Sequence, residues 1–115
     1  MLQSIGQLVE LDDENLMDAV TAISGSGPAY FYYLIEAMTF SGVSIGLSKQ
    51  NALKLARETF LGAAALLDKS EEDVSSLREA VTSPGGTTEA ALNTFQKNNK
   101  YFKLVKKAII SARNR

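Results

Sequence analysis

Three residue types that serve many active sites are absent from this sequence of 115 residues, which has no cysteine, no histidine and no tryptophan. Without cysteine the chain forms no disulfide and offers no thiol nucleophile. Without histidine it cannot build a Ser-His-Asp triad or the usual zinc sites, so we expect no metal. Any acid–base chemistry must therefore come from Asp, Glu, Lys, Tyr or a bound cofactor.

A charge excess of either sign is also lacking, because 12 Lys and Arg residues nearly balance 13 Asp and Glu residues. A net charge of -1 creates no field that attracts nucleic acid or an anionic membrane, so we expect neither as a partner. The start of the chain has neither the basic nor the apolar part of a secretory signal, which predicts a cytoplasmic protein. An apolar content of 45% is typical of a single globular domain.

Apolar residues recur at helical spacing along most of the chain. Ser48, Ser70 and the Asn98-Asn99 pair are expected at helix boundaries, and residues 42–47 are expected to form a connector. A β-branched run at 5–11 resembles a short strand with nothing to pair with. The pattern predicts an all-α bundle of about five or six helices, at 13–23, 28–40, 49–67, 70–81, 87–98 and 100–112.

The segment from Pro28 to Phe40 is apolar on every side. From Ala19 to Ser48 the only charged side chain is Glu36. A helix of this kind is buried on all sides, and it is too short to span a bilayer. One small domain cannot easily cover it, so we interpret the excess as a subunit interface. The alternative is the central core helix of a monomer.

Two glycine motifs interrupt the helices. In Ser24-Gly25-Ser26-Gly27-Pro28 no strand precedes the glycines, and the third glycine of a dinucleotide fingerprint would fall at Tyr30, so we expect a helix restart there. In the stretch from Val81 to Thr88, Gly86 stands three residues before Glu89 and can cap a helix. The free amides of Gly86, Thr87 and Thr88 would then hold a carboxylate or phosphate. The alternative is an ordinary surface turn.

Three stretches carry a resemblance to a known family: Asp18 to Tyr30, Leu61 to Ala64, and Val81 to Thr88. They resemble, in order and spacing, the C-terminal domain of pyrroline-5-carboxylate reductase, the enzyme of the last step in proline biosynthesis. The resemblance implies an oxidoreductase that moves a hydride from NAD(P)H to the C=N carbon of 1-pyrroline-5-carboxylate.

The family also suggests roles for individual residues. It implies a substrate-binding loop made of Ser83, Gly85, Gly86, Thr87 and Thr88. The Thr88 hydroxyl would serve the ring nitrogen as the catalytic group, and Val81 would lie near the nicotinamide. Glu71 is a weaker catalytic candidate, for polarising the imine or ordering a water. Its alternative role is that of a first-turn acid on a helix dipole.

The resemblance further implies a division of labour. Residues 1–12 would be the linker or last strand of a missing nucleotide-binding domain, and residues 13–115 the helical dimerisation and substrate-binding domain. That missing domain would bind NAD(P)H, so we expect no cofactor site in this chain and no activity from it alone. The expected assembly is an interlocked homodimer, or a larger ring of dimers. Two alternatives are a free-standing helical oligomerisation module and a reductase of another small imino acid.

Overall fold

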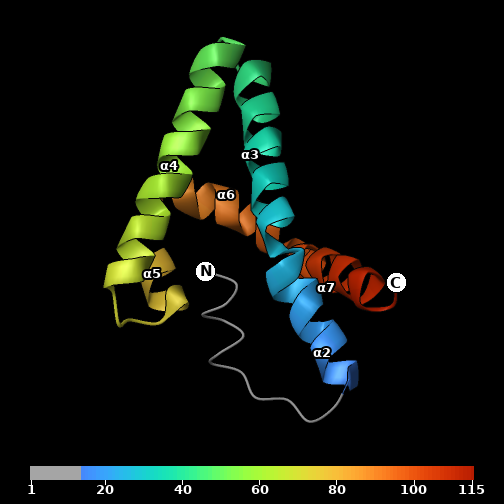
Figure 1. The fold of residues 1–115 in the computed structure, drawn as a ribbon. Coiled ribbons are helices and arrows are strands. Elements are labelled where there is room, and N and C mark those ends of the chain that lie inside the picture. Colours follow the sequence, from blue (N-terminus) through green and yellow to red (C-terminus); the bar gives the residue numbers. More distant parts are fainter. Residues whose placement is uncertain (1–13) are drawn as a thin grey trace. The chain divides into compact units, whose positions relative to one another are not determined.

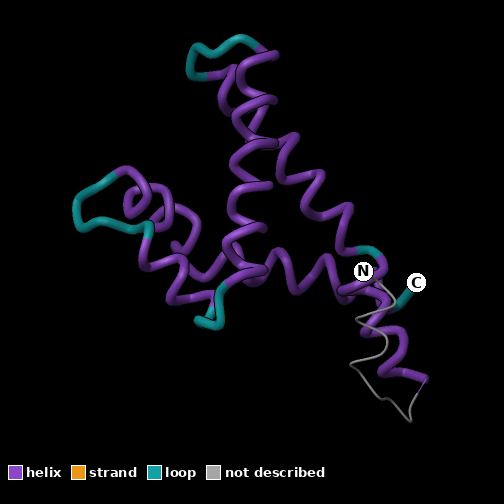
Figure 2. The backbone as a smooth tube through the Cα atoms, turned by 60° about the vertical axis from the view of Figure 1, so that its left-hand side comes forward, coloured by secondary structure: helices purple, strands orange, loops and turns teal. Residues whose placement is uncertain are grey.

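The computed structural model describes residues 14–115, and this part of the chain consists of helices joined by turns (Figures 1 and 2). The all-α prediction is therefore confirmed. Four helices have ten or more residues and two have seven: α2 (Glu14–Val20), α3 (Gly27–Ser44), α4 (Lys49–Lys69), α5 (Val74–Ala80), α6 (Thr87–Gln96) and α7 (Lys100–Arg113). The predicted strand at 5–11 and the boundary at residue 12 lie outside the described residues.

The helices form two compact units. Within the described residues, one unit contains residues 14–33 together with Lys100–Arg115, and the other contains Leu34–Asn99. In the first unit, α7 packs against the turn that follows α2. In the second unit, a short 3-10 turn (Lys97–Asn99) ends α6, and both Asn98 and Asn99 take a positive φ of 57°. The predicted asparagine turn is therefore confirmed. Asparagine suits it because this residue tolerates left-handed backbone geometry better than most others.

The first helix, α2, was predicted to end at Ile23 but ends at Val20. After Val20 the chain continues as a π-helical turn, η1 (Thr21–Gly25), and α3 begins at Gly27. Short polar side chains bond back to the preceding turn, with Thr21 Oγ1 donating to the Met17 carbonyl at 3.1 Å and Ser24 Oγ to the Val20 carbonyl at 2.8 Å. Such side-chain bonds to backbone carbonyls weaken the α-helical hydrogen-bond pattern, so that a π-helical turn follows α2. The predicted helix restart is confirmed.

One backbone carbonyl of the π-helical turn, that of Ala22, accepts a hydrogen bond from a tyrosine hydroxyl. Tyr30, one turn into α3, donates its hydroxyl to the Ala22 carbonyl at 2.5 Å, and Ala22 itself is buried. Removing the donor would leave this carbonyl without its partner inside the unit.

We therefore expect Tyr30→Phe to lower the free energy of unfolding by about 1–2 kcal/mol. Tyr33→Phe is the matched control, because the Tyr33 side chain is 74% exposed and should change stability little. Urea unfolding of both variants measures the difference. Equal effects in the two variants would show that the Tyr30 bond does not stabilise the π-helical turn.

In the second unit, α3 continues to Ser44 instead of stopping at Phe40, so the predicted connector at 42–47 is wrong in its first half. Gly42 lies inside the helix, where an added Cβ would come within 3.0 Å of the Ala52 Cβ on α4. The glycine therefore permits a close approach of two helices and does not break one. The turn itself is made by Gly46, at a φ of 115°. The predicted Ser48 cap is confirmed, because its hydroxyl accepts from the Asn51 amide at 3.1 Å.

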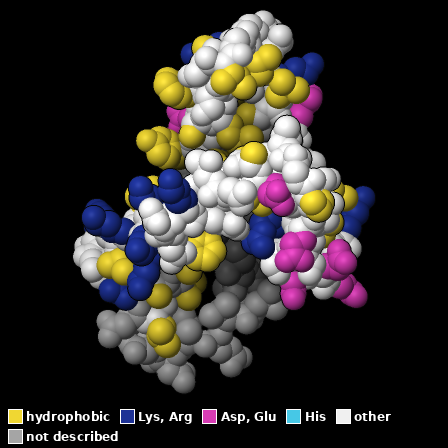
Figure 3. Space-filling view, turned by 180° about the vertical axis from the view of Figure 1, so that it is seen from behind, with side chains coloured by type: hydrophobic (Ala, Val, Ile, Leu, Met, Phe, Trp, Pro, Cys, Tyr) yellow, Lys and Arg dark blue, Asp and Glu magenta, His cyan; other side chains and the backbone are white. Residues whose placement is uncertain are grey.

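The described residues bury few apolar side chains, and all of these are alanines: Ala22, Ala52 and Ala56. Thr39 is the buried polar residue of this part of the chain, and its hydroxyl donates to the Ile35 carbonyl at 2.8 Å. Large apolar residues of α3 are instead open to solvent, with Phe40 75% and Phe31 51% exposed. Figure 3 shows hydrophobic side chains at the surface over the α3–α4 hairpin. The described part of the chain thus has no core of large side chains.

No helix within residues 14–115 combines the length and apolar character that crossing a bilayer requires.

Candidate substrate-binding loop

The loop between α5 and α6 begins with the frayed end of α5. The amides of Val81 and Thr82 donate to the carbonyls of Arg78 and Glu79, at 3.2 and 3.0 Å. The Thr82 hydroxyl also returns to the Arg78 carbonyl at 2.6 Å. These bonds fix the entry into the loop and leave the Val81 side chain 65% exposed at the end of α5.

Residues Ser83 to Gly86 form a tight turn with Pro84 second and Gly85 third, the order typical of a type II turn. Gly85 has a φ of 74°, which L side chains rarely adopt, and the Gly86 amide donates to the Ser83 carbonyl at 3.0 Å. Gly86 has ordinary extended angles, but an added Cβ would lie 3.2 Å from the Ser83 carbonyl oxygen. The two glycines are thus required for different reasons, one for backbone angle and one for space.

The predicted cap at Gly86 is confirmed, but the set of free amides differs from the expectation. Gly86 is the N-cap of α6 without a side-chain cap bond, and its own amide is used by the turn. Glu89 Oε1 accepts from the Gly85 amide at 3.0 Å, one residue before the expected capping-box partner. The amides of Thr87 and Thr88 find no acceptor among residues 14–115 and mark the open end of α6.

The amides of Thr87 and Thr88, followed by that of Glu89, therefore have no acceptor among residues 14–115 and lie at the partly positive end of a ten-residue helix. The hydroxyls of Ser83, Thr87 and Thr88 all lie within residues 83–88, where Thr88 is half-buried and Ser83 and Thr87 are exposed. A ligand that carries an anionic group beside a polar ring atom could bind the amides through the anion and a hydroxyl through the ring atom. Within residues 14–115, no three acidic side chains gather in a way that could hold a metal ion.

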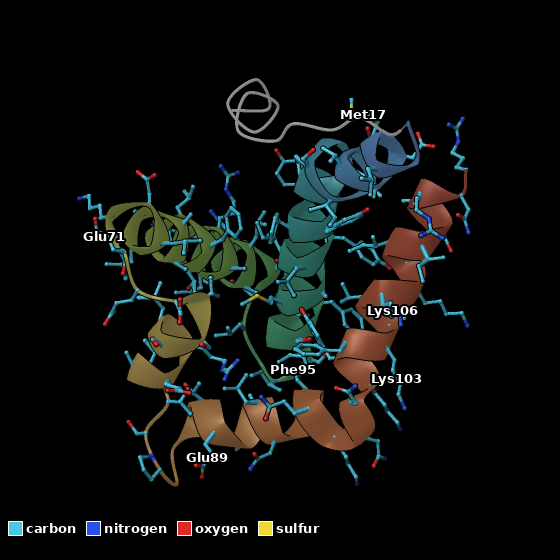
Figure 4. All side chains as sticks on the ribbon, turned by 90° about the horizontal axis from the view of Figure 1, so that it is seen from below. Met17, Glu71, Glu89, Phe95, Lys103 and Lys106 are labelled. Atoms are coloured by element: carbon cyan, nitrogen blue, oxygen red, sulfur yellow. The ribbon has the colours of Figure 1, made fainter. Side chains whose placement is uncertain are left out.

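Glu71 lies elsewhere than the sequence suggested. The helix predicted to begin at Ser70 begins only at Val74, after the N-cap Asp73, and the Ser70 hydroxyl accepts from the Glu72 amide at 3.0 Å. Glu71 is thus a connector residue and not a first-turn acid. Figure 4 shows it at the α4–α5 connector, apart from Glu89 at the start of α6.

The other glycine motif, at residues 24–28, lies between two helical segments. Gly25 ends the π-helical turn, Gly27 opens α3, and the residues before them are helical. The Ser26 amide is occupied by the Thr21 carbonyl at 3.0 Å. A phosphate-binding fingerprint needs glycines between a strand and a helix, so these residues do not fit a nicotinamide dinucleotide.

The sequence predicted that α6 starts at Gly86 with Glu89 as the acid three residues later, but the amide that donates to Glu89 is that of Gly85. An acid three residues after the N-cap usually accepts a hydrogen bond from the amide of the cap residue. The partner moved by one residue because the turn occupies the Gly86 amide.

The sequence is similar to those of known proteins. The family model for pyrroline-5-carboxylate reductase dimerisation matches residues 14–115. A pyrroline-5-carboxylate reductase of Pseudomonas aeruginosa is 49% identical over 115 residues, which is 100% of this chain and 42% of that protein. The corresponding reductase of Synechocystis sp. is 47% identical over 97 residues, which is 84% of this chain and 36% of that protein.

Solved structures agree. A pyrroline-5-carboxylate reductase from Coxiella burnetii superposes with a TM-score of 0.83 at 39% identity, over 90% of this chain and 38% of that one. The Plasmodium falciparum pyrroline carboxylate reductase, solved with NADP bound, gives 0.81 at 37% identity, over 89% of this chain and 38% of that one. The chain spans about two fifths of the length of these relatives. The resemblance noted in the sequence is confirmed, and the chain belongs to the pyrroline-5-carboxylate reductase dimerisation family.

Proposed function

We propose that this chain supplies the dimer interface and the substrate-binding loop of a cytoplasmic reductase that converts 1-pyrroline-5-carboxylate to proline with NAD(P)H. The observation that carries the proposal is the pair of free amides at Thr87 and Thr88, beside the Thr88 hydroxyl. They lie in a chain that is 49% identical over its whole length to a protein named for this reaction.

The substrate presents a carboxylate and a ring nitrogen. In our proposal the amides of Thr87 and Thr88 bind the carboxylate, and the Ser83 hydroxyl stands beside them. Gly85 and Gly86 shape the turn and leave the backbone open to the ligand, although the Gly86 amide itself is committed to Ser83. In this proposal every residue of the loop named above contributes to substrate binding, directly or by shaping the turn.

Thr88 has a second role in this proposal, as the catalytic residue of the chain. Its hydroxyl can donate to an unprotonated imine nitrogen and accept from a protonated one, so it can hold the nitrogen through the reaction. Glu71 is kept as a weaker candidate for polarising the imine or ordering a water. In the intact enzyme it would have to reach the substrate from the α4–α5 connector.

NAD(P)H supplies the hydride when it is bound. The relative from Plasmodium falciparum was solved with NADP. Because the glycines at residues 24–28 follow a helix and not a strand, we assign its binding to a nucleotide-binding domain, with residues 1–12 at the boundary and Val81 near the nicotinamide. The chain's own contribution is to hold and orient the imino acid.

The second proposed role is assembly. Large apolar side chains of α3 and α4 are open in the single chain, including Phe40 at 75% and Leu61 at 60% exposure. A second copy that covers them would complete the missing core, as in obligate dimers that bury more than about 2,000 Å². We propose a homodimer, with a larger ring of dimers as a further level of assembly.

The isolated chain is expected to bind no NAD(P)H and to reduce no imino acid, while the intact enzyme reduces 1-pyrroline-5-carboxylate. Calorimetric titration of the chain with NADH and NADPH measures the first, and oxidation of the cofactor by the intact enzyme measures the second. Nucleotide binding by the isolated chain would refute the proposed division of labour. Turnover of another cyclic imino acid in place of this one would favour the alternative reductase.

A further inference from the structure

Among residues 14–115, Glu89 is the α6 side chain that accepts a hydrogen bond from the backbone of the preceding loop. Its Oε1 atom accepts from the Gly85 amide at 3.0 Å, and Gly85 is the residue with the left-handed φ of 74°. The adjacent Gly86 amide is held by the Ser83 carbonyl at 3.0 Å. The carboxylate of Glu89 therefore fixes the turn from which the free amides of Thr87 and Thr88 emerge.

The same carboxylate brings a negative charge to the end of α6 that would receive the substrate. Glu89 is half-buried, so its charge is less screened there than on an open surface. A negative charge at a helix N-terminus stabilises the helix but opposes a second anion close by. Glu89 thus has two effects of opposite sign on an anionic ligand.

Resting on the function proposed above, we propose that Glu89 is a positioning residue that orders the loop through Gly85 and whose charge limits the affinity for the anionic substrate. Ordering of the loop lowers KM, because the two amides are held ready. The charge raises KM, because it repels the substrate carboxylate. The net KM is a compromise that two substitutions can separate.

Glu89→Gln keeps an oxygen acceptor for the Gly85 amide and removes the charge. We expect its KM for pyrroline-5-carboxylate to fall about two- to fivefold at low ionic strength, and the gain to shrink in high salt. Glu89→Ala removes the acceptor as well. Its KM should exceed that of Glu89→Gln about fivefold, the effect of one lost hydrogen bond. In both variants kcat and the KM for NAD(P)H should stay near those of the unmodified enzyme.

The assay uses the intact reductase, with Glu79→Gln as a matched control that removes one exposed acidic charge from α5. An unchanged KM in Glu89→Gln would overturn the role of the charge, and equal KM values in the glutamine and alanine variants would overturn the positioning role. Melting temperatures identify any variant that fails to fold, and Glu89→Gln then carries the test. If the unmodified enzyme does not reduce pyrroline-5-carboxylate, the proposed function fails first, and titration with proline shows whether the loop binds the anion at all.

Discussion

Replacing Thr88 with alanine in the intact enzyme is expected to lower kcat/KM for 1-pyrroline-5-carboxylate about ten- to a hundredfold. The substitution removes the hydroxyl proposed to bind a ring nitrogen that gains charge during the reaction. A hydrogen bond to a charged group contributes about 1.5–3 kcal/mol, which corresponds to a rate change of this size. The carboxylate contact should survive, because backbone amides provide it. Steady-state kinetics measure the effect.

Three further variants distinguish catalysis from capping. Thr88→Ser keeps the hydroxyl and should keep most of the activity, and Thr87→Ala should have little effect. Gly86→Ala should raise KM more than Thr87→Ala, because its Cβ would lie 3.2 Å from the Ser83 carbonyl oxygen. If the loop were only a cap, these changes would lower stability by about 1 kcal/mol and leave turnover intact. A Thr88→Ala enzyme that melts early but turns over normally would contradict the catalytic role.

Phe40→Asp is expected to cost several kcal/mol of stability and to dissociate the proposed dimer. In the single chain this side chain is 75% exposed, and a surface substitution at such a position usually changes stability by less than about 0.5 kcal/mol. If a second copy covers α3, the same change places a charge in an apolar interface, which is far more costly. Urea unfolding measures the cost.

Gln50→Asp is the control for this variant. It adds one carboxylate at an exposed position in the first turn of α4 and should leave both stability and assembly unchanged. A small cost for Phe40→Asp, comparable to that of the control, would argue that α3 is not covered by a partner.

Local rules predicted much of the described fold. Ser48 and Gly86 lie at the N-caps expected of them, and Asn98 and Asn99 turn the chain into α7. These positions depend on residues close in sequence, so one sequence suffices to identify them.

The errors have a different origin. Gly42 was predicted to lie in a connector, but it lies inside α3, where the absence of a Cβ lets Ala52 of α4 come close. Local helix propensity does not encode such a tertiary contact. The π-helical turn at Thr21–Gly25 depends on back-bonded hydroxyls and on Tyr30, which bonds across eight residues. In the loop, the free amides were predicted for three residues and found for two, because the Ser83 turn competes for Gly86.

If this chain completes its core only with a second copy of itself, sedimentation equilibrium of the unmodified 115-residue chain is the most direct measurement of that pairing. The chain mass is 12.4 kDa, and we expect twice this value, or a higher even multiple, down to micromolar concentration. A stable, cooperatively folded species of 12.4 kDa at that concentration would contradict the account.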